Sequence, residues 1–506
     1  MPLQFLVFVS GATVMILELV SARFFAPYIG TSITVWTSVI GIIMAGLSAG
    51  YYLGGMLGDL WKSTRKLRAI IFTAAVWMGL LAAFHQPAAG WFTSVIHDPV
   101  WLAIAAAASL LLIPSILLGS VTPYAVRLTA HDVKHVGRVA GTLSALSTAG
   151  SIAGTFAAGL ILIPAYGVTA ILFGCSAVLG CAALLSPRKR ALVACAVFLF
   201  ALMLLFKTEE FVHNRMMLRR GIVSDTDSAY SVIRVVRLPA ANSTTGLETV
   251  FMDIDHGNHS AYTPAKPDTQ VFPYTAYYRI SDAFRPDAKR MLLIGGGGHT
   301  VSRDFLRRHP DAHVDVIEID PAVTALAHEY FDVKDDARMT IVHEDARRFL
   351  NRGGMPDGTM LEGSYQVVYG DAFRSEYSVP FHLASLEAAQ RVSAMLDADG
   401  VYVLNIIASE EGKRNQILAA ELATLREVFP GVMALRVPMA NGFAAPGIME
   451  NITLVASKKP ITDAMLRTVK NPELEAMIAN RIDTHNLPEV AVLTDDYAPV
   501  EAMLSL

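Results

Sequence analysis

The sequence predicts a multi-pass α-helical membrane domain followed by an α/β domain with a doubly wound, mostly parallel sheet. Three observations lead to this fold class. Hydrophobic residues make up 53% of the chain and charged residues only 17%, whereas a typical soluble domain carries about a quarter charged residues. The apolar surplus ends at Phe206, and from Lys289 short strand-like runs alternate with helix-like runs. We therefore expect a membrane domain at 1–206, a small β unit with a linker at 207–285, and a Rossmann-like catalytic domain at 286–506.

The apolar half contains several runs that approach the length of a membrane span, which is about 20 residues. A cleaved signal peptide is a rival explanation of the first run. It is disfavoured because no basic segment precedes the run, and because Glu18 and Arg23 fall where a cleavage site would follow. The seven expected spans are 4–24, 34–57, 68–86, 100–121, 139–163, 168–186 and 190–206.

Basic residues are unevenly distributed among the connections between these spans. The connections 87–99 and 164–167 contain no lysine or arginine. Because basic loops stay in the cytoplasm, the pattern predicts a cytoplasmic N-terminus in a cell (inner) membrane. The basic residues of the alternate loops are Lys62, Arg65, Lys66, Arg68, Arg127, Lys134, Arg138, Arg188, Lys189 and Arg190.

With seven spans, the C-terminal half would lie outside the cytoplasm. The run 190–206 has only 17 residues, which is the lower limit for a span. If it does not cross, the catalytic domain lies in the cytoplasm, and this is the arrangement that the sequence analysis favours.

The soluble half begins with short strand-like segments and then changes to a repeating strand–helix pattern. Residues 221–262 contain "YSVIRVVRL" and "ETVFMDI" separated by turns, which indicates a small β unit. The later strands "RMLLIGG", "HVDVIEID", "MTIVH", "YQVVYGD" and "VYVLNII" are followed by helices expected at 300–308, 321–331, 345–351, 381–396 and 412–428. Repeated β-then-α order is typical of a parallel sheet that binds ligands at the carboxyl ends of its strands.

The residues that could carry chemistry lie at those strand ends. Gly295, Gly296 and Gly297 follow the first strand, where backbone without side chains can approach a nucleotide closely. Glu318 ends the second strand, 23 residues after Gly295, at a position suited to ribose hydroxyls. Two further acids follow the third and fourth strands: Asp345 and Asp371. Each acid could instead be a solvated or helix-capping carboxylate, but four consecutive strand ends favour a nucleotide site.

Composition argues against several other classes of function. The net charge is −4 and there is no long basic run, so nucleic-acid binding has little support. All three cysteines lie in the apolar half, and neither a metal-ligand cluster nor a cysteine nucleophile is expected in the soluble half. The sequence lacks a second dinucleotide-binding half, which argues against NAD.

The stretch "LLIGGGGHT…VDVIEIDPAVTALAHEYF…ARMTIVHEDARRFL…YQVVYGDAF…VPFHL" resembles the spermidine synthase (polyamine aminopropyltransferase) family, and in particular its membrane-fused bacterial branch. The resemblance covers roughly residues 220–440. It implies that Glu318 holds the ribose of decarboxylated S-adenosylmethionine and that Asp345 with Ala346 contacts the adenine. Asp371 would match the catalytic aspartate, and Tyr274 the tyrosine that helps to place the attacking amine.

The departures from the family pattern concern mainly the acceptor site. Gly298 and His299 stand in place of an acid and a glycine, and Ser231 replaces a glutamine. Thr275 and Ala276 stand where the family has His-Glu, and Arg374 replaces a second aspartate. Residues that could line a rebuilt acceptor site are Tyr230, Asp255 and Asp496, each of which could also be an ordinary loop residue.

The leading hypothesis is therefore transfer of the aminopropyl group of decarboxylated S-adenosylmethionine to a polyamine or other small-molecule amine. One alternative is another enzyme with an S-adenosylmethionine-type donor, such as a methyltransferase. The other is a non-enzymatic nucleotide or polyamine sensor, or a transport module. In each case no tightly bound cofactor and no metal are expected, the lipid bilayer is a partner, and a homo-oligomer is compatible with the sequence.

Overall fold

The computed structural model describes residues 3–29, 33–96, 98–130, 135–185, 189–243, 245–255, 257–373, 379–439 and 447–505. The chain divides into two compact units. One comprises Met1–Arg220 with Asp227–Val232, and the other comprises Gly221–Thr226 with Ile233–Leu506. The first is helical and the second contains all of the larger sheet.

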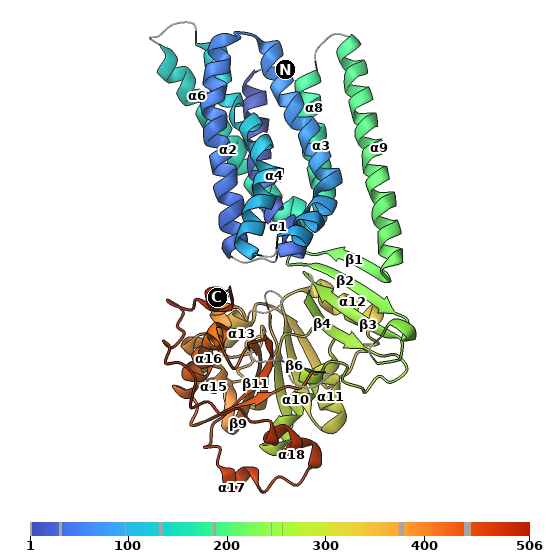
Figure 1. Ribbon diagram of the computed structural model, residues 1–506, viewed down its shortest axis with the longest axis vertical. Coiled ribbons are helices and arrows are strands. Elements are labelled where there is room, and N and C mark those ends of the chain that lie inside the picture. Colours follow the sequence, from blue (N-terminus) through green and yellow to red (C-terminus); the bar gives the residue numbers. More distant parts are fainter. Residues whose placement is uncertain are drawn as a thin grey trace. The chain divides into compact units, whose positions relative to one another are not determined.

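The helical unit is a bundle of long helices (Figure 1). Within the described residues, six candidate spans are at least 18 residues long and apolar enough to cross a membrane. The spans are Leu3–Ala26, Val35–Leu60, Thr64–Val95, Val100–Thr129, Val136–Ala165 and Arg190–Arg219. The helices are α1 (Leu3–Ile29), α2 (Ile33–Leu60), α3 (Thr64–Val95), α4 (Pro99–Gly119), α5 (Val121–Thr129), α6 (Val136–Ala157) with a π-helical turn at Ala158–Leu162, α7 (Ile163–Ala165), α8 (Val168–Leu184) and α9 (Lys189–Arg219).

The last two helices correct one expectation. The segment expected to be too short to cross, 190–206, is part of the 31-residue helix α9, which continues to Arg219. The short helix is α8, with 17 residues. Hydropathy falls after Phe206 because charged residues appear, but leucine, methionine, glutamate, lysine and arginine all favour helix, so the backbone does not change conformation there.

Glycines allow close helix packing inside this unit. A Cβ atom at Gly150 would collide with the carbonyl oxygen of Phe8, and one at Gly154 with that of Ala12, so α6 packs directly on the backbone of α1. A Cβ atom at Gly50 would likewise collide with the carbonyl oxygen of Ile116, so α2 packs closely on α4. Glycine at these three positions therefore lets the helix backbones approach closely.

The small β unit is a four-stranded sheet with strand order β1-β2-β3-β4. The pairs β2–β3 and β3–β4 are antiparallel, and the register shifts between Met252 and Asp253. One face packs on α12 (Pro321–Tyr330) through a shared apolar cluster. The strands are β1 (Ile222–Asp227), β2 (Val232–Leu238), β3 (Thr249–Ile254) and β4 (Gly257–Tyr262).

The larger sheet has seven strands in the order β10-β11-β9-β8-β5-β6-β7. Strands β5 to β9 are parallel, and the chain moves from β5 outward to β7 before it returns to β8 on the other side of β5. This confirms the doubly wound, Rossmann-like sheet. The strands are β5 (Arg290–Ile294), β6 (His313–Glu318), β7 (Met339–His343), β8 (Tyr365–Gly370), β9 (Leu396–Ala408), β10 (Gly431–Arg436) and β11 (Glu450–Ser457).

Helices cover both faces of this sheet (Figure 1). Alternate residues of one strand serve different cores: Leu292 belongs to the cluster with α13, α15, α16 and α19, and Leu293 to the cluster with η4, α11 and α18. Because both faces are buried, the strands are almost continuously apolar. The helices are α10 (Pro273–Tyr277), η4 (Tyr278–Ala283), α11 (Thr300–Arg308), α12 (Pro321–Tyr330), α13 (Ala346–Arg352), α14 (Phe381–Ala384), α15 (Leu386–Met395), α16 (Gln416–Arg426), α17 (Asp463–Leu466), α18 (Pro472–Ala479) and α19 (Val500–Ser505).

Two details differ from the expected α/β pattern. The helix expected at 381–396 is divided at Ser385, whose side chain caps α15 by accepting the N–H of Ala388 at 3.3 Å. The sheet is also extended by β10 and β11, and β11 pairs antiparallel to both β9 and β10.

Candidate active site

The strand-end residues meet where the chain order of the parallel sheet reverses. Gly295 follows β5 and Asp371 follows β8, and these two strands are neighbours. Glu318 ends β6 on the other side of β5. Ligands of doubly wound sheets bind in the crevice at such a switch point.

Gly295 occupies a position that only glycine fits. Its φ is +96°, and a Cβ atom there would collide with the carbonyl oxygen of Asp371. The N–H of Asp371 in turn donates to the carbonyl oxygen of Ile294 at 2.8 Å. The glycine-rich loop and the candidate catalytic acid are thus joined through their backbones.

Glu318 is 8% exposed and its carboxylate binds the glycine-rich loop. Oε2 accepts the N–H groups of Gly296 at 3.0 Å and Gly297 at 3.2 Å, and Oε1 accepts the N–H of Asp320 at 2.9 Å. Burial raises the pKa of Glu318 above its usual value, although these three hydrogen bonds act to lower it. Three of roughly four acceptor sites of the carboxylate are therefore occupied by backbone, so Glu318 shapes the loop itself.

Asp345 lies at the start of α13, two residues after β7. Its Oδ1 accepts the N–H of Arg348 at 2.9 Å, which is an N-cap contact. Oδ2 lies 3.5 Å from Nε2 of His382 on α14. Both Asp345 and the adjacent Ala346 are partly buried.

Asp371 lies among several polar side chains. Burial raises the pKa of its carboxyl to about 7, while hydrogen bonds from Tyr278 and Asn405 act in the opposite direction. Nδ2 of Asn405 lies 3.5 Å from Oδ1 of Asp371. Asn405 is 2% exposed, and within the described part of the chain no donor reaches its Oδ1.

Tyr274 lies near Asp371, whose charge adds to burial in raising the pKa of the phenol. Its hydroxyl donates to the carbonyl oxygen of His259 on β4 at 3.2 Å. The next residue of β4, Ser260, accepts the N–H of Gly298 through its Oγ at 2.8 Å. The edge strand of the small sheet therefore contacts both the tyrosine and the glycine-rich loop.

His299, which ends the glycine-rich loop, is completely buried in a left-handed conformation with φ +54°. Among the described residues, neither of its ring nitrogens has a hydrogen-bond partner. Burial lowers its pKa to about 4, so the imidazole is neutral at neutral pH.

Sequence reasoning missed Tyr278 and Asn405. Each left a signal: Tyr278 lies one helical turn after Tyr274, and Asn405 interrupts the apolar strand "VYVLNII". Only the packing of η4 and β9 against the end of β8 brings Tyr278 to the carbonyl oxygen of Gly370 and Asn405 to the carboxyl of Asp371.

None of the contacts described above brings the three candidate acceptor residues to Asp371. Tyr230 lies in the segment 227–232, which groups with the helical unit, and is 53% exposed. Asp255 lies at the turn between β3 and β4 with φ +49°, and Asp496 is exposed. Arg374 lies outside the described residues.

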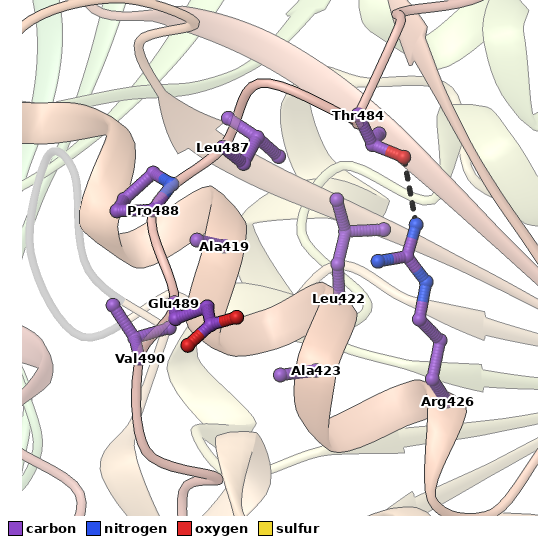
Figure 2. Close-up of a pocket in the computed structure, with 9 residues that line it drawn as sticks. All are labelled: Ala419, Leu422, Ala423, Arg426, Thr484, Leu487, Pro488, Glu489 and Val490. Atoms are coloured by element: carbon purple, nitrogen blue, oxygen red, sulfur yellow. Dashed lines mark hydrogen bonds between the residues drawn. The ribbon is translucent and has the colours of Figure 1, made fainter.

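A separate hollow of about 380 Å³ lies between α16 and the segment 484–490 (Figure 2). Arg426 donates to Oγ1 of Thr484 at 2.7 Å across it. None of the strand-end residues lines this hollow. Over the described ranges, no group of three or more His, Cys, Asp and Glu side chains is placed to hold a metal ion.

The α/β unit is similar in sequence to known proteins. Residues 279–455 match the family model described as the spermine/spermidine synthase domain, which includes Glu318, Asp345, Asp371 and Asn405. The part of the α/β unit that contains the strand ends is thus similar to this family.

Two curated relatives come from bacteria. The polyamine aminopropyltransferase of Vibrio vulnificus is 31% identical over 172 residues, which cover 34% of this chain and 54% of that protein. The probable polyamine aminopropyl transferase of Bifidobacterium longum is 29% identical over 237 residues, 44% of this chain and 50% of that protein. The chain thus spans about half the length of these relatives. The crystal structure of a probable spermidine synthase from Corynebacterium glutamicum aligns with TM-score 0.41 and 22% identity, covering 53% of this chain and 88% of that chain.

Proposed function

We propose that the protein is an aminopropyltransferase that moves the aminopropyl group of decarboxylated S-adenosylmethionine to a polyamine or another small-molecule amine. The observation that carries the proposal is the carboxyl of Asp371, whose pKa is about 7 at a switch point beside a glycine-rich loop. The family match of the same domain supports this reaction class.

The donor half of the site is the loop Gly295–Gly298 with Glu318, Asp345 and Ala346. The loop presents backbone that a nucleoside can approach closely, since the left-handed glycines at 295 and 297 carry no side chain. Glu318 holds the loop through Gly296 and Gly297 and retains about one free acceptor site for a ribose hydroxyl. Decarboxylated S-adenosylmethionine is a co-substrate in this scheme.

The reaction needs a base because the attacking amine is protonated in solution. Deprotonation of an amine with a pKa of about 10.4 costs roughly 4.6 kcal/mol at pH 7, because that pH lies about 3.4 units below the pKa. The nitrogen lone pair forms a bond to the carbon next to the sulfonium, the carbon–sulfur bond breaks, and sulfur keeps that electron pair. Asp371 receives the proton that the nitrogen loses, and a base with a pKa near 7 suits this task at neutral pH.

The acceptor half is best supported around Tyr274, Asp371 and Asn405. An ammonium group has only hydrogen-bond donors, and both the carboxylate of Asp371 and Oδ1 of Asn405 are acceptors. Oδ1 of Asn405 is buried and has no partner among the described residues, so an incoming N–H would satisfy it. Roles for Tyr230, Asp255 and Asp496 rest on the sequence alone.

The proposal extends to the helical unit, whose long apolar helices would anchor the enzyme in the inner membrane. The catalytic unit would then act on amines at the membrane surface. A homo-oligomer is compatible with this arrangement.

The deciding experiment is a panel of amines incubated with purified full-length protein and either decarboxylated or intact S-adenosylmethionine, with products identified by mass spectrometry. Methylthioadenosine together with an aminopropylated amine is the expected result. S-adenosylhomocysteine would contradict the proposal and identify a methyltransferase. Donor binding without any turnover, unchanged in Asp371→Asn, would identify a sensor.

A further inference from the structure

One acidic residue of the helical unit lies well inside a helix. The four acids of residues 1–206 are Glu18, Asp59, Asp98 and Asp132, the last of which falls in an expected connection. Asp59 lies near the end of α2 and pairs with Arg127, and Asp98 caps the start of α4. Glu18 instead lies eight residues before the end of the candidate span Leu3–Ala26, or roughly 12 Å along the helix. An ionisable residue inside such a span is by default a candidate functional group.

The side chain of Glu18 lies on the inner face of α1. Residues three, four and seven positions apart share a face of an α-helix, and Val14, Ser21 and Phe25 on this face are all buried. Glu18 itself is half-buried. Helix α1 is also the most enclosed of the six candidate spans, with 61% of its most apolar stretch buried. The carboxyl therefore faces the other helices and not the outside of the bundle.

No positive charge compensates this carboxyl in the described part of the chain. The basic residue of α1 is Arg23, which binds Asp227 at 2.9 Å and the carbonyl oxygen of Ala229 at 2.8 Å. Asp227 and Ala229 group with the helical unit. Glu18 has neither a hydrogen bond nor an ion pair among the described residues. Because an uncompensated charge in apolar surroundings is unfavourable, this position requires a proton or a cation.

A π-helical turn lies at the level of Glu18. The contacts of Gly150 and Gly154 with α1 show that α6 and α1 advance together by four residues. Continued for one turn, this register brings the π-helical turn Ala158–Leu162 beside residues 16–20, and the turn does contact α1. Such turns are rare and are frequently found at functional sites. The irregular turn is therefore a second observation, independent of the charge, that marks this level of the bundle.

We propose that Glu18, together with the π-helical turn, binds the ammonium group of an amine, so that the helical unit has an amine site of its own. An ammonium group has only hydrogen-bond donors, and a carboxylate has only acceptors. The buried Val14 and Phe25 on the same face offer apolar surroundings for the alkyl chain of an amine. Hard metal ions need several oxygen ligands, and within the described ranges Glu18 belongs to no group of side chains placed to hold one. The choice of an amine as the cation rests on the proposed function, whereas the position of the site does not.

The test measures binding of radiolabelled spermidine to the full-length protein in phosphatidylcholine nanodiscs. Asp371→Asn is the background, because the α/β unit is also expected to bind amines. In this background Glu18→Gln should weaken one class of sites at least about tenfold, since a hydrogen bond to a charged group is lost. Asp59→Asn is the matched control and should bind normally, because Asp59 is an exposed acid of the same unit whose ion pair contributes little. Equal binding with and without the Glu18 carboxyl would overturn the proposal.

A chemical readout on the protein without the Glu18 substitution covers the case in which Glu18→Gln does not fold. Dicyclohexylcarbodiimide modifies carboxyl groups in apolar surroundings, and mass spectrometry locates the modified residue. Saturating spermidine should slow the modification of Glu18 at least about fivefold, and at pH 7 spermidine is too fully protonated to act as a nucleophile. Modification that spermidine does not slow would show that Glu18 holds a proton, and equal protection by sodium chloride would show an inorganic cation. Either result, or a Glu18 that is unmodified even without spermidine, would contradict the proposal.

This outcome is separable from that of the proposed function. If the unmodified protein forms no methylthioadenosine with any amine, the proposed function fails. Binding of spermidine that depends on Glu18 still decides whether the helical unit holds an amine, because neither measurement at Glu18 requires the donor or any turnover.

Discussion

The backbone N–H of Gly296 donates to Oε2 of Glu318 at 3.0 Å, so the acid at the end of β6 holds the glycine-rich loop that follows β5. The sequence predicts that Glu318 holds the ribose of the donor. The structure adds that the same carboxylate fixes the shape of the loop that the donor must approach. Substitution of Glu318 should therefore damage the donor site in two ways.

We predict that Glu318→Ala raises the donor dissociation constant at least about thirtyfold, because charge-assisted hydrogen bonds worth about 2–4 kcal/mol are lost. Isothermal titration calorimetry with the donor measures this change. Glu329→Ala, at an exposed position of α12 in the same unit, is the matched control and should bind normally. A change of less than about fivefold in Glu318→Ala would show that the nucleotide does not bind there.

Asp371→Asn should leave donor binding intact and lower kcat by a factor of about 10²–10⁴, the usual contribution of a positioned general base. The amide is nearly isosteric with the carboxyl but cannot accept the proton of the amine. Single-turnover formation of methylthioadenosine and donor affinity are measured on the same preparation. Equal damage to both would assign a structural role to Asp371.

The pH dependence follows from the raised pKa of Asp371, which is about 7. The base must be ionised, so kcat/KM should fall as the pH drops below about 7 and reach a plateau above it. An unperturbed aspartate, with a pKa of about 3.9, would give a plateau down to about pH 5. The profile is measured from pH 5 to 9 at saturating donor, and a plateau that continues down to pH 5 would contradict the assignment.

Gly295→Ala should destabilise the α/β unit and abolish turnover. A left-handed backbone costs a non-glycine residue roughly 1–2 kcal/mol, and at this position the new Cβ would also displace the carbonyl of Asp371. Gly358→Ala is the matched control, because Gly358 has nearly the same φ, +93°, with open space around it. Thermal unfolding and activity of both variants separate backbone strain from the collision; equal effects would exclude the collision.

Membrane topology can be tested at Ser243, a residue of the small β unit. An even number of crossings would leave the catalytic unit on the same side as the N-terminus, which the basic loops place in the cytoplasm, and the described residues contain six long candidate spans. Ser243→Cys should then resist a membrane-impermeant maleimide in intact cells and react after permeabilisation, with the unmodified protein as background. Labelling in intact cells would place the catalytic unit outside, in agreement with seven crossings.

The sequence alone determined the α/β order, the strand ends and the positions of Gly295, Glu318, Asp345 and Asp371. It could do so because a buried parallel strand is a short apolar run, and the residues that follow it must lie at the binding edge of the sheet. Apolar run length also located the helices of the first half.

Tertiary structure alone decided which distant side chains meet at that edge. Because η4 and β9 pack beside the end of β8, Tyr278 reaches Gly370, 92 positions away in the chain, and Asn405 reaches Asp371, 34 positions away. The extra strands β10 and β11, the extension of α9 to Arg219 and the use of Glu318 by the loop were likewise not predicted. Local hydropathy reports burial, whereas strand pairing and hydrogen-bond partners depend on groups far apart in sequence.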